Sequence, residues 1–170
     1  MLFPRTKLAV VDRLRQHWSK QRHLHLNAGA PEDAVRLFEV KSQISLPKDF
    51  AQYLLAIDGF QLERSNDLES CDDEAFVFYP LSKLAPSEGT PGHYVFCENW
   101  MTLRLYAICL DFDSMFGQVT IVGSEGLHAC APNFSNFVDM YLAGAEALYL
   151  AGPLIVPLSE CKSNNGAASV

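Results

Sequence analysis

Residues 46–60 read Leu46-Pro47-Lys48-Asp49-Phe50-Ala51-Gln52-Tyr53-Leu54-Leu55-Ala56-Ile57-Asp58-Gly59-Phe60, and this stretch decides the expected fold. Pro47 can open a helix, because its missing N–H would have no intrahelical partner at that position. Asp58-Gly59 ends the helix, since glycine accepts the positive φ common at helix ends. The stretch therefore predicts a short scaffold helix without a catalytic group, followed by an extended run from Phe60. The apolar stripe expected to be buried consists of Phe50, Tyr53, Leu54 and Ile57.

Two further helices are expected on the N-terminal side of this stretch. Apolar residues recur every three or four positions from Leu8 to Trp18, with basic side chains outside that stripe. Residues 27–30 then break the chain with a glycine between small residues. Pro31 opens the second helix, and the two acidic residues after it are favourable against the helix dipole. The side chains expected to be buried there are Val35, Leu37 and Phe38, with Val40 as a further candidate.

After Phe60 the apolar period changes to that of β-strands. Alternating or continuous apolar runs predict strands over residues 75–79, 93–97, 103–110, 118–122 and 126–131. The connections expected between them are a turn or short helix at 81–84, a loop at 87–92 and a hairpin turn at 111–117.

The chain is expected to close with a helix over residues 134–150, capped by Asn133 or Ser135. Residues 153–157 are bracketed by prolines, a pattern that favours a short edge strand. The order of helices, strands and a last helix predicts an α+β fold, with an antiparallel or mixed β-sheet and helices packed on one face.

The length of 170 residues suits one domain with a sizeable core. We expect a single domain over residues 1–158, with 1–30 as an N-terminal helical extension and 159–170 as a flexible tail. Residues 1–5 contain no apolar run typical of a secretory signal. The longest apolar runs are shorter than the roughly 20 residues of a membrane-spanning helix. These features predict a cytoplasmic protein without membrane contacts.

Charge is distributed unevenly along the chain. Residues 1–25 carry six basic residues and one acidic residue, whereas the remaining 145 carry seven basic and 19 acidic residues, a net charge of −12. An acidic body repels nucleic acid and steers a cationic partner toward it. Nucleic-acid binding is therefore not expected.

The cysteines indicate structural thiols rather than a metal or redox site. Their number is odd, they lie far apart, and no C-x-x-C pair occurs, so neither a zinc knuckle nor a redox dithiol is predicted. We expect no cofactor and no metal. The five are Cys71, Cys97, Cys109, Cys130 and Cys161.

Several short patterns suggest catalysis, yet each has a simpler structural explanation. Aspartates are common in strand turns, two nearby histidines without further ligands suit a solvated linker, and the glycines of residues 123–126 are misplaced for a lipase elbow. No nucleotide-binding glycine motif and no H-E-x-x-H occurs. The chain is therefore not expected to be an enzyme. The patterns are Asp111-x-Asp113, His23-x-His25, Gly123-Ser124-Glu125-Gly126 and His128 near Cys130.

An acidic segment, residues 63–74, is the strongest candidate for function. Its six carboxylates are offset only by Arg64, so it is either a solvated connection or a docking face for a basic protein. Trp100 is either an interface anchor or a core residue. The expected partner-binding residues are Glu63, Asp67, Glu69, Asp72, Asp73, Glu74 and Trp100.

Four blocks of the chain resemble the SMI1/KNR4, or SUKH, superfamily. The first is the opening stretch, with its Leu-Pro start, aromatic residue, apolar helix and Asp-Gly end. The match spans roughly residues 31–145. The other three blocks are Phe78-Tyr79-Pro80-Leu81-x-x-Leu84, the strand 103–110 with Gly117-x-Val119, and the closing Phe134-x-x-Phe137 helix.

The resemblance implies a non-catalytic binding module with an α+β fold. Bacterial proteins of this type are implied to be immunity proteins that bind and neutralise polymorphic or contact-dependent toxins, often nucleases. A fungal relative is implied to regulate cell-wall synthesis through protein contacts. We therefore expect an immunity protein whose partner is a basic toxin domain, with a regulatory or scaffold module lacking a toxin partner as the alternative.

Overall fold

Helix α3 (Lys48–Ala56) lies where the sequence predicted it in the computed structural model, which describes residues 9–21, 24–62, 76–111, 115–150 and 152–157. The Pro47 carbonyl accepts the Ala51 N–H at 2.8 Å, so the proline stands directly before the first turn. Gly59 has a φ of +70°, and a Cβ there would lie 2.6 Å from the Phe78 carbonyl oxygen. Pro47 as the start of the helix and the positive φ of Gly59 are therefore confirmed, although the helix already ends at Ala56, where Ile57 becomes extended. The whole predicted stripe is also buried, at 0–1% exposure for Phe50, Tyr53, Leu54 and Ile57.

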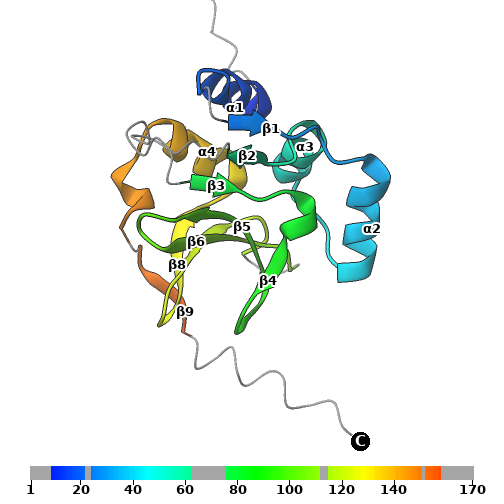
Figure 1. The fold of residues 1–170 in the computed structure, drawn as a ribbon. Coiled ribbons are helices and arrows are strands. Elements are labelled where there is room, and N and C mark those ends of the chain that lie inside the picture. Colours follow the sequence, from blue (N-terminus) through cyan, green and yellow to red (C-terminus); the bar gives the residue numbers. More distant parts are fainter. Residues whose placement is uncertain (1–8, 22–23, 63–75, 112–114, 151, 158–170) are drawn as a thin grey trace, which may run out of the picture.

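Three helices gather on one side of the sheet. Helix α1 (Val10–Trp18) contacts both α3 and α4 (Phe134–Leu142), and α3 also contacts α4. Figure 1 shows these three above the sheet, with α2 (Glu32–Ser42) at the side of the molecule. Trp18 is 1% exposed, and its Nε1–H donates to the Tyr141 hydroxyl at 2.9 Å. The N-terminal helix thus belongs to the core, and the expected tail over 159–170 lies outside the described residues.

The main sheet is antiparallel and has the order β3-β5-β6-β7-β8-β9, with β4 also paired to β5. A two-stranded sheet, β1-β2, lies among the helices (Figure 1). The α+β class is therefore confirmed. The strands are β1 (Leu24–Leu26), β2 (Phe60–Leu62), β3 (Phe76–Phe78), β4 (Ala85–Ser87), β5 (Thr90–Asn99), β6 (Arg104–Cys109), β7 (Val119–Val122), β8 (Gly126–Ala131) and β9 (Leu154–Pro157), and the short 3-10 turns are η2 (Leu81–Lys83) and η3 (Glu146–Leu148).

Two of the expected boundaries are wrong. The last helix stops at Leu142 rather than at residue 150, because Gly144 takes a φ of +60° and the Ala145 N–H donates back to the Met140 carbonyl at 2.9 Å. The expected loop at 87–92 is instead the tight end of the β4–β5 hairpin, in which Gly89 supplies a φ of +74°. Both differences come from glycines whose role depends on the hydrogen bonds around them.

Helix α2 buries less than its apolar content predicts. Val35 is buried and Phe38 is half-buried, as expected. Leu37 and Val40 are instead 52% and 69% exposed, so the expectation of their burial is wrong. The helix contacts the fold mainly through α3, and only one of its faces is covered.

An aromatic cluster fills the space between the helices and the sheet. The Phe78 ring makes edge or tilted contacts with rings from α1, α3 and α4, at centroid distances of 5.1–6.2 Å. Edge-to-face aromatic pairs add to the free energy of burial, so this cluster joins elements far apart in sequence. None of the helices within the described ranges combines the length and the apolar character needed to cross a membrane.

Candidate protein-binding surface

The turn of the β5–β6 hairpin presents three large apolar side chains to solvent. Asn99 pairs with Arg104, which leaves residues 100–103 as the turn. Trp100 is 46% exposed, Met101 66% and Leu103 88%. Side chains of this size on a turn cost free energy in water, so their exposure marks the turn as a candidate contact surface. We call residues 100–103 the hairpin turn.

The backbone of the hairpin turn is anchored. Asn99 is fully buried, and its Oδ1 accepts the Thr102 N–H at 3.0 Å. Leu103 has a φ of +52°, a left-handed conformation that is uncommon for a residue with a branched side chain. Strain of this kind persists only where surrounding contacts enforce it. The Asn99 side chain therefore ties the backbone of the turn to the sheet, while the apolar side chains of the turn are exposed.

Of the two interpretations of Trp100, the core position is excluded by its exposure. The six predicted acidic residues, Glu63, Asp67, Glu69, Asp72, Asp73 and Glu74, lie outside the described residues. Phe76, the first described residue after them in the chain, pairs with Asn99 in the neighbouring strand. Strand β3 therefore starts beside the residue that precedes Trp100.

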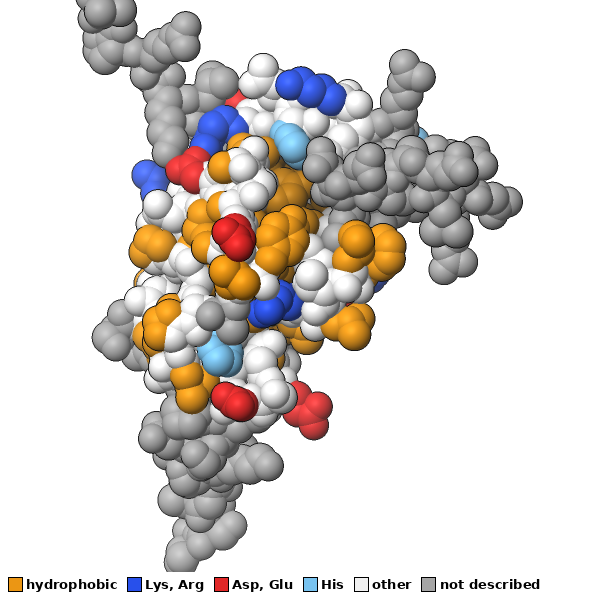
Figure 2. Space-filling model, turned by 90° about the vertical axis from the view of Figure 1, so that its left-hand side faces the viewer, with side chains coloured by type: hydrophobic (Ala, Val, Ile, Leu, Met, Phe, Trp, Pro, Cys, Tyr) orange, Lys and Arg blue, Asp and Glu red, His pale blue; other side chains and the backbone are white. Residues whose placement is uncertain are grey.

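A second apolar area lies on the side of the molecule that carries η3 and β9. Figure 2 views this side and shows hydrophobic side chains gathered across it. Tyr149 packs edge-on against Phe76 at a centroid distance of 5.9 Å. The exposed large side chains of this area are Tyr149, Leu150, Leu154 and Ile155, each 37–55% exposed.

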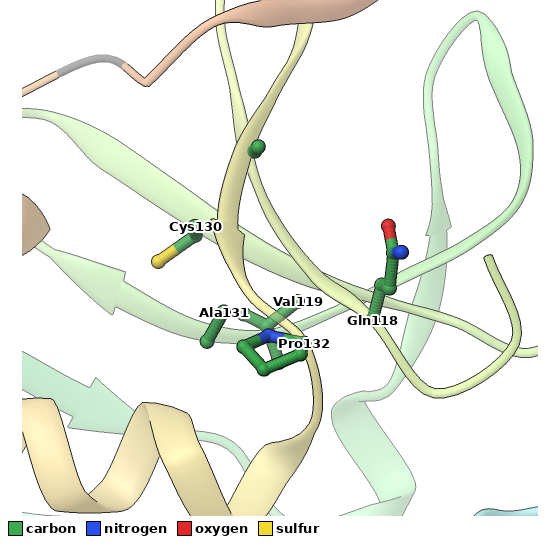
Figure 3. Close-up of a pocket in the computed structure, with 6 residues that line it drawn as sticks. Gln118, Val119, Cys130, Ala131 and Pro132 are labelled. Atoms are coloured by element: carbon green, nitrogen blue, oxygen red, sulfur yellow. The ribbon is translucent and has the colours of Figure 1, made fainter.

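A hollow of about 250 Å³ between β7 and β8 contains Cys130. Burial raises the pKa of this thiol to about 12, so it stays protonated near neutral pH. Figure 3 shows the Cys130 thiol and the Gln118 amide pointing in different directions rather than converging on one point. The His128 Nδ1 lies 2.9 Å from the Gly152 carbonyl oxygen. The described residues that line this hollow include no carboxylate, imidazole or amine beside the thiol.

Of the other chemical patterns, the structure describes one in full and two only in part. Residues 123–126 form the β7–β8 turn, closed by the Gly123 N–H and the Gly126 carbonyl at 2.8 Å, with a strand rather than a helix following. His25 lies in β1, opposite Gln61 of β2. The sequence did not predict β1 as a strand. His23 and Asp113 lie outside the described residues. Within the described ranges, no three His, Cys, Asp or Glu side chains are grouped so as to hold a metal ion.

A groove between α2 and η2 was not predicted. Its volume is about 380 Å³, and its walls include Leu37 from one side and Asp58, Leu81 and Leu84 from the other. Sequence reasoning missed it because Leu37 was assigned to the core. The usable signal is that the apolar residues of α2 cover more than half of the helix circumference, from Val35 round to Val40, which is more than one neighbouring helix can bury.

Comparison with models of known protein families and with curated protein sequences gives no match to this chain. The likeness to the SMI1/KNR4 superfamily therefore rests on the four sequence blocks.

Proposed function

We propose that this chain is a non-catalytic protein-binding module, and that it acts in the cytoplasm as an immunity protein against a basic toxin domain. The observation that carries the proposal is the hairpin turn, where an anchored backbone presents Trp100, Met101 and Leu103. Tryptophan is enriched among residues that dominate binding energy. A preorganised turn also lowers the entropy lost on association.

Charge supports a basic partner. The chain after residue 25 carries a net charge of −12. The acidic segment ends two residues before Phe76, which pairs beside the hairpin turn. In this proposal the carboxylates raise the rate of encounter, and the apolar side chains hold the complex once it has formed. A nuclease is a fitting target, because a surface that binds nucleic acid is basic.

The test needs a candidate toxin. We take the protein encoded by the gene next to that of this chain, called the neighbouring gene product, as the binding partner. The double variant Trp100→Ala/Leu103→Ala should weaken its binding by about tenfold or more, the usual effect of losing a central anchor. Leu55→Ala is the matched control, since Leu55 is an apolar side chain of similar exposure, 41%, on α3 rather than on the hairpin turn. Dissociation constants from calorimetry and survival of cells expressing the toxin are the two measurements.

Charge reversal tests the acidic segment separately. Asp72→Lys/Asp73→Lys should lower the association rate, with the largest effect at low salt. Unchanged binding and unchanged protection in both double variants would refute the proposal. Binding without any effect on cell survival would favour a regulatory module over an immunity protein.

A further inference from the structure

The groove between α2 and η2 has one long helical wall. Ala34, Leu37 and Lys41 line it at intervals of three and four residues along α2. At 1.5 Å per residue, the wall from Pro31 to Lys41 is about 15 Å long. That length equals about four or five residues of extended chain. The groove volume of about 380 Å³ lies within the range of ligand sites.

The groove surface is mostly apolar and is partly open to solvent. Leu81 and Leu84 are each only 8% exposed, whereas Leu37 on the opposite wall is 52% exposed. An apolar side chain inserted between Leu37 and Leu84 would remove further apolar area from water. The lining therefore favours a ligand with at least one aliphatic residue.

Asp58 places one carboxylate in the lining of the groove. Its Oδ1 accepts the Leu81 N–H at 2.6 Å, and the side chain is half-buried. No Lys, Arg or His of the described residues lies within ion-pair distance of it, although Lys41 lines the same groove. Burial raises the pKa of the Asp58 carboxyl, as expected for a carboxylate without a cationic partner. A cation supplied from outside would pair with it.

We infer that this groove binds an extended segment of a partner protein, with an arginine or lysine of the segment placed against Asp58 and a neighbouring aliphatic side chain placed between Leu37 and Leu84. The inference rests on the proposed role in protein binding and adds a second contact site to the hairpin turn. Lys41 disfavours a second basic residue at its end of the groove.

Capped peptides test the groove directly. The probe is acetyl-Ala-Leu-Arg-Leu-Ala-amide, and its match carries citrulline, a neutral residue of nearly the same shape, in place of arginine. In titrations followed by amide NMR, the arginine peptide should shift the signals of Ala34, Leu37 and Leu84. The citrulline peptide should bind about tenfold more weakly, since a hydrogen bond to a charged group contributes more than a neutral one.

Three variants locate the binding. Asp58→Asn keeps an acceptor for the Leu81 N–H but removes the charge, so it should lower affinity for the arginine peptide alone. Leu37→Lys should lower affinity for both peptides. Val40→Lys is the matched control, because Val40 is exposed on the same helix but does not line the groove. Trp100→Ala/Leu103→Ala should bind the peptides normally.

Several outcomes would overturn the inference. They are the absence of saturable shifts in the groove, equal binding of both peptides, and equal loss in Leu37→Lys and Val40→Lys. Self-association that Leu37→Lys abolishes would assign the groove to a second copy of the chain instead. Capture of the neighbouring gene product by the parent chain with no peptide binding would refute the groove alone, whereas peptide binding without capture would refute the proposed partner and leave the groove standing.

Discussion

Asp49 shows how one side chain joins two helices. Its Oδ1 accepts the Phe50 N–H at 3.0 Å, within the first turn of α3. Its Oδ2 accepts both the N–H and the hydroxyl of Ser135 at 2.8 Å, in the first turn of α4. A carboxylate is favourable at a helix N-terminus, and here one carboxylate serves two. Of the two predicted caps of α4, Asn133 is the one that caps, with its Oδ1 2.8 Å from the Asn136 N–H.

Replacing Asp49 by Ala should lower the free energy of unfolding by about 1–2 kcal/mol, the upper part of the range for a lost helix cap. Asp33→Ala is the control, because Asp33 makes the same local contact, to the Ala34 N–H at 3.0 Å, with no hydrogen bond to a distant element among the described residues. Urea denaturation measures both. Equal losses in the two variants would show that the link to Ser135 contributes nothing.

At the scale of elements, α1 is a structural part of the domain. Leu14 and Trp18 are 0% and 1% exposed, and the Trp18 ring makes edge contacts with Phe60 and Phe78 at 5.1 Å. The basic side chains of this helix lie outside the apolar face formed by Leu14 and Trp18. One of them, Arg13, pairs with Asp139 of α4. Helix α1 therefore stabilises the fold by burying its apolar face, and an ion pair links it to α4.

The two tryptophans give a matched test of this assignment. Trp18→Ala should destabilise the protein by about 3–5 kcal/mol, as expected for emptying a buried aromatic site. Trp100→Ala should change stability by only about 0.5 kcal/mol or less, because its side chain is already half exposed. Thermal and urea unfolding provide the values. A small loss in Trp18→Ala would mean that α1 is dispensable for the fold.

At the scale of the whole molecule, Asp58 couples stability to pH. It lies between α3 and β2 in the chain, and its carboxylate accepts the N–H of Leu81, the first residue of η2. Burial raises its pKa from the ordinary value of 3.8. The folded state therefore holds this proton more tightly than the unfolded state does. Its stabilising contribution is present below pH 3.8 and is lost as the pH rises through the raised pKa.

Asp58→Asn should consequently gain stability relative to the parent chain as the pH rises from about 3 to 7. The asparagine keeps an acceptor for the Leu81 N–H and never buries a charge. Urea unfolding of both proteins across this pH range gives the difference in unfolding free energy. A difference that is constant, or that changes in the opposite direction, would contradict the assignment.

The sequence by itself determined the elements whose signals are local. The apolar stripe and end residues of α3 predicted that helix and its buried face, and the period change after Phe60 predicted most strands of the sheet. These predictions succeed because helix and strand periods depend on neighbouring residues. The pairing of β1 with β2 was missed, since two three-residue strands carry almost no periodic signal.

Only the tertiary structure decided which apolar faces are covered. The helical pattern predicts burial of Leu37, and the sequence leaves Trp100 as either an interface anchor or a core residue. The exposure of both depends on whether a distant element packs over them. The same holds for Asp49 and Ser135, which lie 86 positions apart in the chain and meet only in the folded molecule. The groove therefore lay beyond the sequence, whereas the hairpin turn was predicted only through Trp100. A local pattern shows which side of an element avoids water, whereas contacts between distant residues determine what, if anything, covers that side.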